Sequence, residues 1–293
     1  MTRFWAVLTA LPLAAALTIV PAGAVSSMGP QVLRPGAPPD LSVKALVAAA
    51  SKYVAKYEQE FAFLVADEAY TQTRLQASAA VQSRELRSEL FLAFLPVDKE
   101  WVAVRDVMRV DGTPVAVRDD LRALLSRREA TRGVASEIVE RNARYNIGKV
   151  TRNFNEPTLP LLLFDARRVA DVKFEKKTVV KDGDTTLVTL AFSERGKPTL
   201  VRGPEGSMPA KGELLIEAGT GVIRRTKFEL DRDGVKVRLT TEYAPDARLG
   251  LWLPTIFTER YDSSEEPREI VVCEATYSNY RRFDVTARIK EPK

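Results

Sequence analysis

The chain has 293 residues, with 44 Lys and Arg, 39 Asp and Glu, no histidine and one cysteine. The missing histidine excludes histidine-based triads, dyads and zinc motifs, and a single cysteine excludes an intramolecular disulfide. The net charge of +5 comes from interspersed acids and bases, not from basic runs with interleaved aromatics, so we expect no nucleic-acid partner.

Residues 1–24 have the pattern of a secretory signal peptide. Arg3 precedes an apolar run that ends in Ala22-Gly23-Ala24, a small-residue cleavage site. The alternative is an uncleaved membrane anchor, and Pro12 and Pro21 argue against it. We predict export to the periplasm or cell envelope of a bacterium, with no transmembrane segment after cleavage.

The rest of the chain divides into a leader and a domain. Residues 25–40 contain four prolines and two glycines without an apolar period, which predicts a flexible leader. Residues 41–293 are long enough to bury a core and fit the size of a single β-rich domain.

The domain is predicted to begin with a helix and three strands. Asp40 is suited to cap a helix over residues 41–58, whose apolar residues recur at helical spacing. Strands are predicted over 61–73, 84–95 and 100–110, because apolar and polar residues alternate there.

Residues 118–164 are predicted to be a helical insertion in the sheet. Two segments have apolar residues at helical spacing, and Gly148 follows the second, where a helix end is expected. Leu161–Phe164 form the most apolar cluster after residue 24, which indicates a short buried helix or a plug packed into the sheet.

Short alternating segments dominate the remainder of the chain. The segment 235–243 alternates cleanly, with one apolar and one polar face, which is typical of an antiparallel meander. Cys273 alternates with apolar neighbours and is predicted to be a buried strand residue. Strands are predicted near 170–180, 185–193, 212–218, 221–230, 235–243, 252–261, 269–277 and 280–289.

The segments GELLIEAGTGVIRRTKFEL (212–230) and VKVRLTTEYAPDARLGLWLPTIFTERY (235–261) resemble the repeated hairpin of the LolA/LolB-like superfamily. The shared pattern is a Gly before an apolar strand, a Thr-Gly turn, a strand that ends in Tyr, and a Leu-Pro entry to the next strand. The chain is similar to a secreted bacterial family within that superfamily. The insertion at 118–164 departs from the smaller carriers.

This resemblance implies a curved half-barrel whose concave face is closed by helices and encloses an apolar cavity. Members handle lipoproteins or other lipidic molecules in the periplasm. We therefore predict an α+β fold with a curved antiparallel sheet of roughly ten strands and helices packed on its concave face.

Aromatic and leucine residues are candidates to line such a cavity, although ordinary packing within a core has the same composition. Trp101 and Trp252 begin strands and suit a cavity mouth, where an amphipathic ring contacts an apolar ligand with a polar head. The full candidate set is Phe91, Phe94, Trp101, Leu162, Phe164, Phe228, Trp252 and Phe257.

Arg281 and Arg282 are the candidates for holding a phosphate or carboxylate headgroup, since a guanidinium offers two parallel donors. A solvated strand edge is the simpler interpretation of the same residues. Asp67 and Glu68 are an adjacent pair of acids on a predicted strand, so their side chains are expected to point to opposite faces.

The sequence contains no motif for a nucleophile, a phosphate loop or a metal, so we expect no cofactor and no enzymatic activity. We predict an exported binding or carrier protein for an apolar or lipidic ligand, with a lipid or a lipidated protein as partner. The alternative is an envelope interaction module whose concave face is filled by its own Leu161–Phe164 segment and whose partner is another envelope protein.

Overall fold

The chain is described here from a computed structural model. The described residues are 38–60, 63–76, 79–95, 100–116, 140, 142–150, 152, 156–203, 206–232 and 234–282, without the side chains of 60, 63, 93–95, 100–102, 203 and 232. From Pro39 on they belong to one compact unit, Pro39–Lys293. The predicted signal peptide, most of the predicted leader, the first helix predicted within 118–164 and the start of the second lie outside these ranges. The described end of the second contains the short 3-10 helix Ala143–Tyr145, which Gly148 follows.

No helix among the described residues is both long and apolar enough to cross a membrane. The described elements follow the predicted order closely. In chain order the elements are α1 (Val43–Glu60), β1 (Phe63–Gln76), β2 (Gln82–Leu95), β3 (Glu100–Val110), β4 (Thr113–Pro114), η1 (Ala143–Tyr145), η2 (Leu159–Phe164), η3 (Val169–Asp171), β5 (Val172–Asp182), β6 (Thr185–Glu194), β7 (Val201–Gly203), β8 (Gly206–Met208), β9 (Lys211–Glu217), β10 (Ile223–Arg232), β11 (Val235–Asp246), β12 (Leu251–Ser263) and β13 (Glu269–Arg282).

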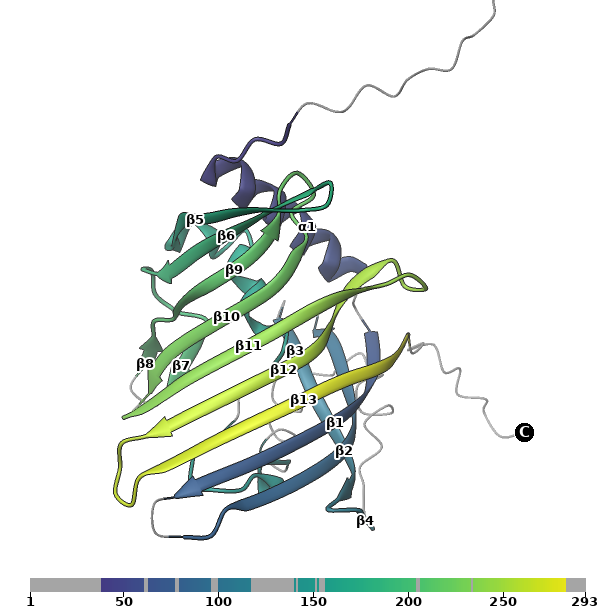
Figure 1. Ribbon diagram of the computed structural model, residues 1–293, viewed down its shortest axis with the longest axis vertical. Coiled ribbons are helices and arrows are strands. Elements are labelled where there is room, and N and C mark those ends of the chain that lie inside the picture. The colour runs from purple at the N-terminus through teal and green to yellow at the C-terminus, as the bar shows by residue number, and fades with distance from the viewer. Residues whose placement is uncertain are drawn as a thin grey trace, which may run out of the picture. The chain divides into compact units, whose positions relative to one another are not determined.

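Eleven strands form one open antiparallel sheet, in the order β4-β3-β2-β1-β13-β12-β11-β10-β9-β6-β5. Figure 1 shows the sheet curving, with β3 passing behind β12 and β13. Five strand pairs contain a register shift, and such bulges bend a strand and increase its twist. The predicted α+β half-barrel is confirmed.

Alternation along the strands decides which side chains enter the core. In β11, Val237, Leu239, Thr241 and Tyr243 are buried, and the residues between them are exposed or partly exposed. The same inward alternation recurs across the sheet and builds one continuous hydrophobic cluster on the concave side with α1 and η2. As predicted, Cys273 is buried at an inward position of β13.

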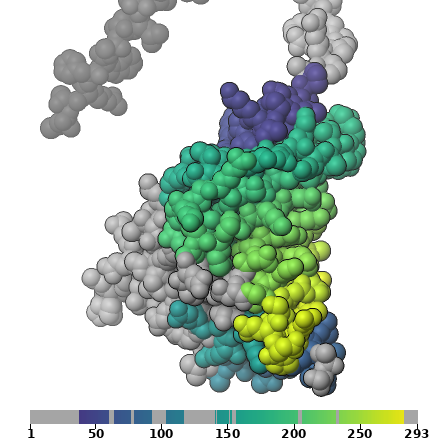
Figure 2. Space-filling view, turned by 90° about the vertical axis from the view of Figure 1, so that its left-hand side faces the viewer, coloured from purple at the N-terminus to yellow at the C-terminus, as the bar shows by residue number. Residues whose placement is uncertain are grey.

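Helix α1 covers part of the concave face near β5 and the β9–β10 turn (Figure 1), and in Figure 2 its purple surface lies beside the teal surface of β5 and β6. Its buried stripe is Leu46, Ala50, Val54 and Tyr57. The helix begins two residues later than predicted, because Ser42 supplies the cap. The Ala45 N–H donates to Ser42 Oγ, and Asp40 instead accepts from the Ser42 N–H.

The C-terminal strands differ from prediction in one respect. The segments expected as separate strands at 269–277 and 280–289 are joined, because β13 continues to Arg282 through an irregularity at Asn279, whose φ is 50°. Residues after Arg282 lie outside the described ranges. The short hairpin of β7 and β8 forms its own small sheet and was not predicted.

The contact between α1 and the β9–β10 turn requires glycine at position 221. Gly221 has φ +75°, and a Cβ there would lie 2.2 Å from the Ala49 carbonyl carbon and oxygen. Gly183 also has a positive φ, of +56°, but a Cβ there would meet nothing within 4 Å.

We predict that Gly221→Ala destabilises the protein more than Gly183→Ala. The Gly183 variant carries only the conformational cost of a left-handed residue, roughly 1–2 kcal/mol. The Gly221 variant adds a backbone clash with α1. Urea denaturation of the two variants measures the difference, and equal losses of unfolding free energy would contradict the close approach of α1.

Candidate functional site

The concave face has two parts. We call the first the apolar compartment: the inward side chains of β6, β9, β10 and β11 with α1 and η2. All six residues of η2, Leu159–Phe164, are buried, and Phe164 stacks on Phe174 of β5 with ring centroids 5.3 Å apart. We call η2 the plug, because its side chains fill the concave side of the sheet.

The plug is tied to the sheet through one backbone oxygen. The hydroxyls of Thr241 and Tyr243, neighbouring inward residues of β11, each donate to the Pro157 carbonyl at 2.8 Å. Burial raises the pKa of Tyr243 above its usual value, so this phenol remains a neutral donor. The inward alternation of β11 therefore places two hydroxyls where the chain enters the plug.

The predicted cavity residues fall into different environments. Phe228 and Phe257 are fully buried and face inward, and Leu162 and Phe164 belong to the plug. Phe91 is also buried, but it pairs with Val65 and Val104 and lies on the face opposite to that of its inward-facing neighbours Leu90 and Leu92.

Of the two predicted tryptophans, only Trp252 has a described side chain. Trp252 is partly buried on the side of β12 opposite Leu251 and Leu253, and the Arg224 guanidinium lies 3.8 Å from its ring centre. Phe94 and Trp101 are register partners in β2 and β3, and their side chains lie outside the described residues.

Arg281 lies on the outer face between two carboxylates. It donates to Asp67 Oδ1 at 2.8 Å and also pairs with Glu89. Asn279 donates to the other Asp67 oxygen at 3.0 Å, and these bonds from Asn279 and Arg281 lower the pKa of Asp67. Arg282 is exposed. Arg281 is thus engaged within the sheet surface.

We call the second part of the concave face the polar compartment: the inward side chains of β3, β2, β1, β13 and β12 with the loop 142–152. Asp67 and Glu68 point to opposite faces, as predicted from their adjacency. Glu68 is directed inward, and Arg105 Nε donates to its two oxygens at 2.9 and 2.7 Å. Arg105 also lies 4.7 Å from the centre of the Tyr70 ring.

A second buried carboxylate, Glu259 of β12, accepts two phenol hydrogen bonds. Tyr70 donates to Oε1 at 2.9 Å and Tyr261 to Oε2 at 2.5 Å. Burial, and then the Glu259 charge, raise the pKa of both phenols, and the same causes raise the pKa of Cys273 to about 12. The thiol and the phenols are therefore protonated near neutral pH; the phenols donate hydrogen bonds, and the thiol is a poor nucleophile.

The loop 142–152 covers this compartment and inserts Arg152 into it. Arg152 donates to Cys273 Sγ at 2.9 Å, to Gln72 Oε1 at 2.6 Å and to the Ile147 carbonyl at 3.1 Å. Gln72 Oε1 also accepts the Ile147 N–H, and Gln72 Nε2 donates to the Tyr145 carbonyl at 3.1 Å. The Gln72 side chain of β1 thus holds the backbone of the loop through two hydrogen bonds.

Glu269 fastens the same loop at its other side. Its Oε2 accepts from Arg74 at 2.7 Å, and its Oε1 accepts the N–H of Lys149 at 2.7 Å and that of Val150 at 3.3 Å. Burial alone would raise the pKa of Glu269, but the bonds from Arg74 and the two backbone N–H groups outweigh it and lower the pKa.

The sequence contained a signal for part of this network. Glu68, Gln72 and Glu259 occupy inward positions of alternating strands, where a charged or amide side chain must have a partner. Arg152 carries no such signal, because it reaches the sheet from a loop. Among the described residues, no cluster of acids and cysteine is arranged to hold a metal ion.

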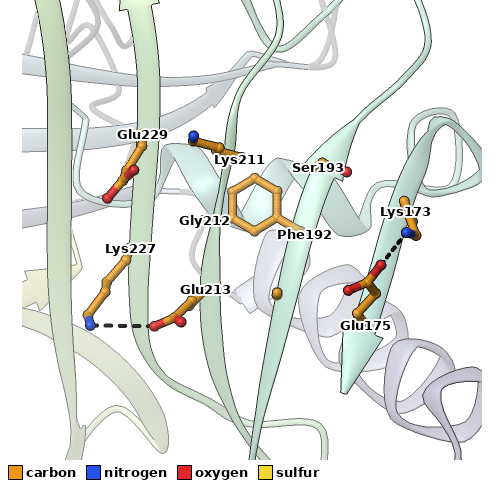
Figure 3. Close-up of a pocket in the computed structure, with 10 residues that line it drawn as sticks. Lys173, Glu175, Phe192, Ser193, Lys211, Gly212, Glu213, Lys227 and Glu229 are labelled. Atoms are coloured by element: carbon orange, nitrogen blue, oxygen red, sulfur yellow. Dashed lines mark hydrogen bonds and ion pairs between the residues drawn. The ribbon is translucent and has the colours of Figure 1, made fainter. Parts of the chain in front are cut away.

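A hollow of about 470 Å³ lies on the outer face of the sheet, across β5, β6, β9 and β10 (Figure 3). Small residues of β6 leave room there, and three lysines and three glutamates surround it. Lys173 pairs with Glu175, and Lys227 lies 3.4 Å from Glu213. Because acids and bases are equal in number, this hollow has no net charge to select a charged ligand. Its charged residues are Lys173, Glu175, Lys211, Glu213, Lys227 and Glu229.

Comparison with solved structures finds similarity to a LolA superfamily protein from Nitrosomonas europaea, with 11% identity over 86% of this chain and 99% of that chain and a TM-score of 0.34. A putative outer membrane lipoprotein-sorting protein domain from Vibrio parahaemolyticus has 10% identity over 84% and 95%, with a TM-score of 0.34. A DUF1329 family protein from Desulfovibrio piger has 10% identity over the same shares, with a TM-score of 0.36.

The first of these proteins is described as a member of the LolA superfamily. Neither protein-family models nor curated protein sequences give a match. At these TM-scores the structural likeness carries no argument about ligand or activity, and we argue function from the residues of this chain.

We predict that the attachment of the loop 142–152 weakens in acid. The pKa of Glu269 is lower in the folded than in the unfolded state, so its stabilisation is complete above the unfolded pKa, about 4.3. This stabilisation is lost as the pH falls through the lower pKa that Glu269 has in the folded state. Denaturant unfolding of wild type and Glu269→Gln at a series of pH values measures this contribution.

At pH 7 the Gln variant should lose roughly 1.5–3 kcal/mol, because charged hydrogen bonds are removed. The gap between variant and wild type should shrink below pH 4. A gap that stays constant down to pH 3 would show that the Glu269 charge does not stabilise the loop.

Proposed function

We propose that this protein is a non-enzymatic carrier or binding protein for an apolar or lipidic ligand, exported to the periplasm or cell envelope. The observation that best supports the proposal is the plug: an entirely apolar segment lies on the concave face of a curved sheet. Its entry is tied to that sheet by the two hydroxyl bonds at Pro157.

The chemistry of the plug makes exchange with a lipid chain reasonable. Leucine and phenylalanine side chains cover the inward face of the sheet, and an alkyl chain covers apolar surface equally well. Burial of each such side chain contributes about 1.5–3 kcal/mol, and a ligand restores that amount when it takes the place of the plug. The hydrogen bonds at Pro157 contribute only about 1 kcal/mol each.

Export is the second part of the proposal and rests on residues 1–24. Their apolar run and small-residue ending are those of a cleaved signal. A carrier in that compartment would keep a lipid or a lipidated protein out of water between membranes. We narrow the candidate contact set to Leu162, Phe164, Phe228 and Phe257, which belong to one buried hydrophobic cluster on the concave side.

One observation favours the alternative, an interaction module with a self-filled core. All six plug residues are buried, with Leu163 fully inaccessible. In that case the plug is a permanent part of the core, and the outer surface would contact another envelope protein.

We predict that loosening the plug increases ligand uptake. Thr241→Val with Tyr243→Phe removes both bonds to Pro157 and should lower stability by about 2 kcal/mol. Native mass spectrometry, after incubation with phospholipid or fatty acid, should show a larger lipid-bound fraction for this double variant than for wild type.

Lys181→Ala with Thr178→Val is a matched control, because it removes side-chain hydrogen bonds on β5, away from Pro157. It should leave uptake unchanged. Carriage of apolar ligands is refuted if neither wild type nor the double variant takes up lipid and protein purified from its own envelope fraction carries none.

We predict that Leu162→Asp distinguishes a displaceable plug from a permanent core. A displaceable plug tolerates the charge by leaving the sheet, so the protein stays folded and its lipid uptake changes. Phe228→Asp, in the fixed strand β10, should unfold the protein through burial of an unpaired charge. Circular dichroism compares the two, and unfolding by both substitutions would favour the self-filled module.

A further inference from the structure

Arg152 is a buried cation whose hydrogen bonds go to neutral acceptors. It is 2% exposed, and its three hydrogen bonds go to a thiol sulfur, an amide oxygen and a backbone carbonyl. Burial alone would lower the pKa of Arg152, but the neighbouring Tyr70 and Cys273 and the Glu259 carboxylate outweigh it and raise the pKa. A second arginine of the compartment, Arg105, is partly buried and has Glu68 as its counter-ion at 2.7 Å.

A small cavity of about 30 Å³ lies at these two arginines. Both line it, and both have a buried nitrogen without a hydrogen-bond partner: Nη2 of Arg105 and Nε of Arg152. Tyr70, Leu86 and Val107 supply part of the remaining wall. Unpartnered guanidinium donors of two arginines beside one hollow point to an acceptor in that hollow.

Size and charge restrict the acceptor. One water-sized atom needs on the order of 10–15 Å³, so the cavity accommodates roughly two. That matches the two oxygens of a carboxylate better than the four of a phosphate. Both donors belong to guanidinium cations, which favour an anionic acceptor over a neutral one.

We propose that the polar compartment binds a single carboxylate group between Arg105 and Arg152. The carboxylate accepts from Arg105 Nη2 and Arg152 Nε. This goes beyond the proposed function, because the site takes a free carboxylate as well as the headgroup of an amphiphile.

The test uses three ligands. Acetate has the carboxylate without a long alkyl chain, laurate has both, and dodecanol has the chain without the carboxylate. Isothermal titration calorimetry and thermal unfolding are followed for the wild-type chain and for Arg152→Gln. Arg224→Gln is the matched control. Arg152 lies over the Tyr261 ring and Arg224 over the Trp252 ring, but Arg224 is on the outer face and beside Glu217.

We expect laurate to bind wild type at least tenfold more tightly than dodecanol, and acetate to raise the unfolding temperature where dodecanol does not. Arg152→Gln should weaken carboxylate binding about tenfold or more, the usual effect of losing a charged hydrogen bond. Arg224→Gln should bind like wild type. Methyl laurate, which keeps the chain and removes the charge, gives the same comparison on wild type alone if Arg152→Gln fails to fold.

The outcomes separate this inference from the proposed function. Equal binding of laurate, dodecanol and methyl laurate overturns the carboxylate site and leaves apolar carriage standing. Binding of acetate and laurate with equal affinity supports the site, identifies a free carboxylate as its ligand and counts against apolar carriage. Absence of binding by every probe overturns both.

Discussion

An open curved sheet exposes its inner face unless something else covers it, and this constraint governs the rest of the structure. The sheet ends at β4 and β5 without closing, so its concave side must be filled from other parts of the chain. The helix α1 and the plug cover one half, and the loop 142–152 covers the other. Each cover matches the chemistry of the strands beneath it, which is why the concave face has an apolar and a polar compartment.

The two compartments are held by different forces, and this difference bears on which cover can move. The plug contributes apolar contacts that any hydrocarbon can replace, with two directional bonds at Pro157. The loop is held by Gln72 and Glu269 through hydrogen bonds that require specific donors and acceptors. A lipid chain therefore competes with the plug but not with the loop, so ligand exchange is expected at the apolar side.

Buried charges in the polar compartment are compensated locally. Glu68 has Arg105, Glu269 has Arg74, and Glu259 accepts two phenol hydroxyls and raises the pKa of nearby Arg152. What remains without a partner is one buried nitrogen on each of Arg105 and Arg152. A carboxylate bound between them would use both donors and would join the loop to the ligand.

The sequence by itself determined the antiparallel sheet, the helix before it and the burial of the Leu-rich segment, because periodicity of two or 3.6 residues and apolar clustering are local properties. It also determined that Asp67 and Glu68 face opposite ways. Only the tertiary structure decided that Arg281 pairs with carboxylates on the outer face and that Arg152 donates a hydrogen bond to Gln72. These contacts join residues that are far apart in the chain. Alternation assigns a face to a strand residue, but the partner it meets depends on strand order, register and the path of a loop.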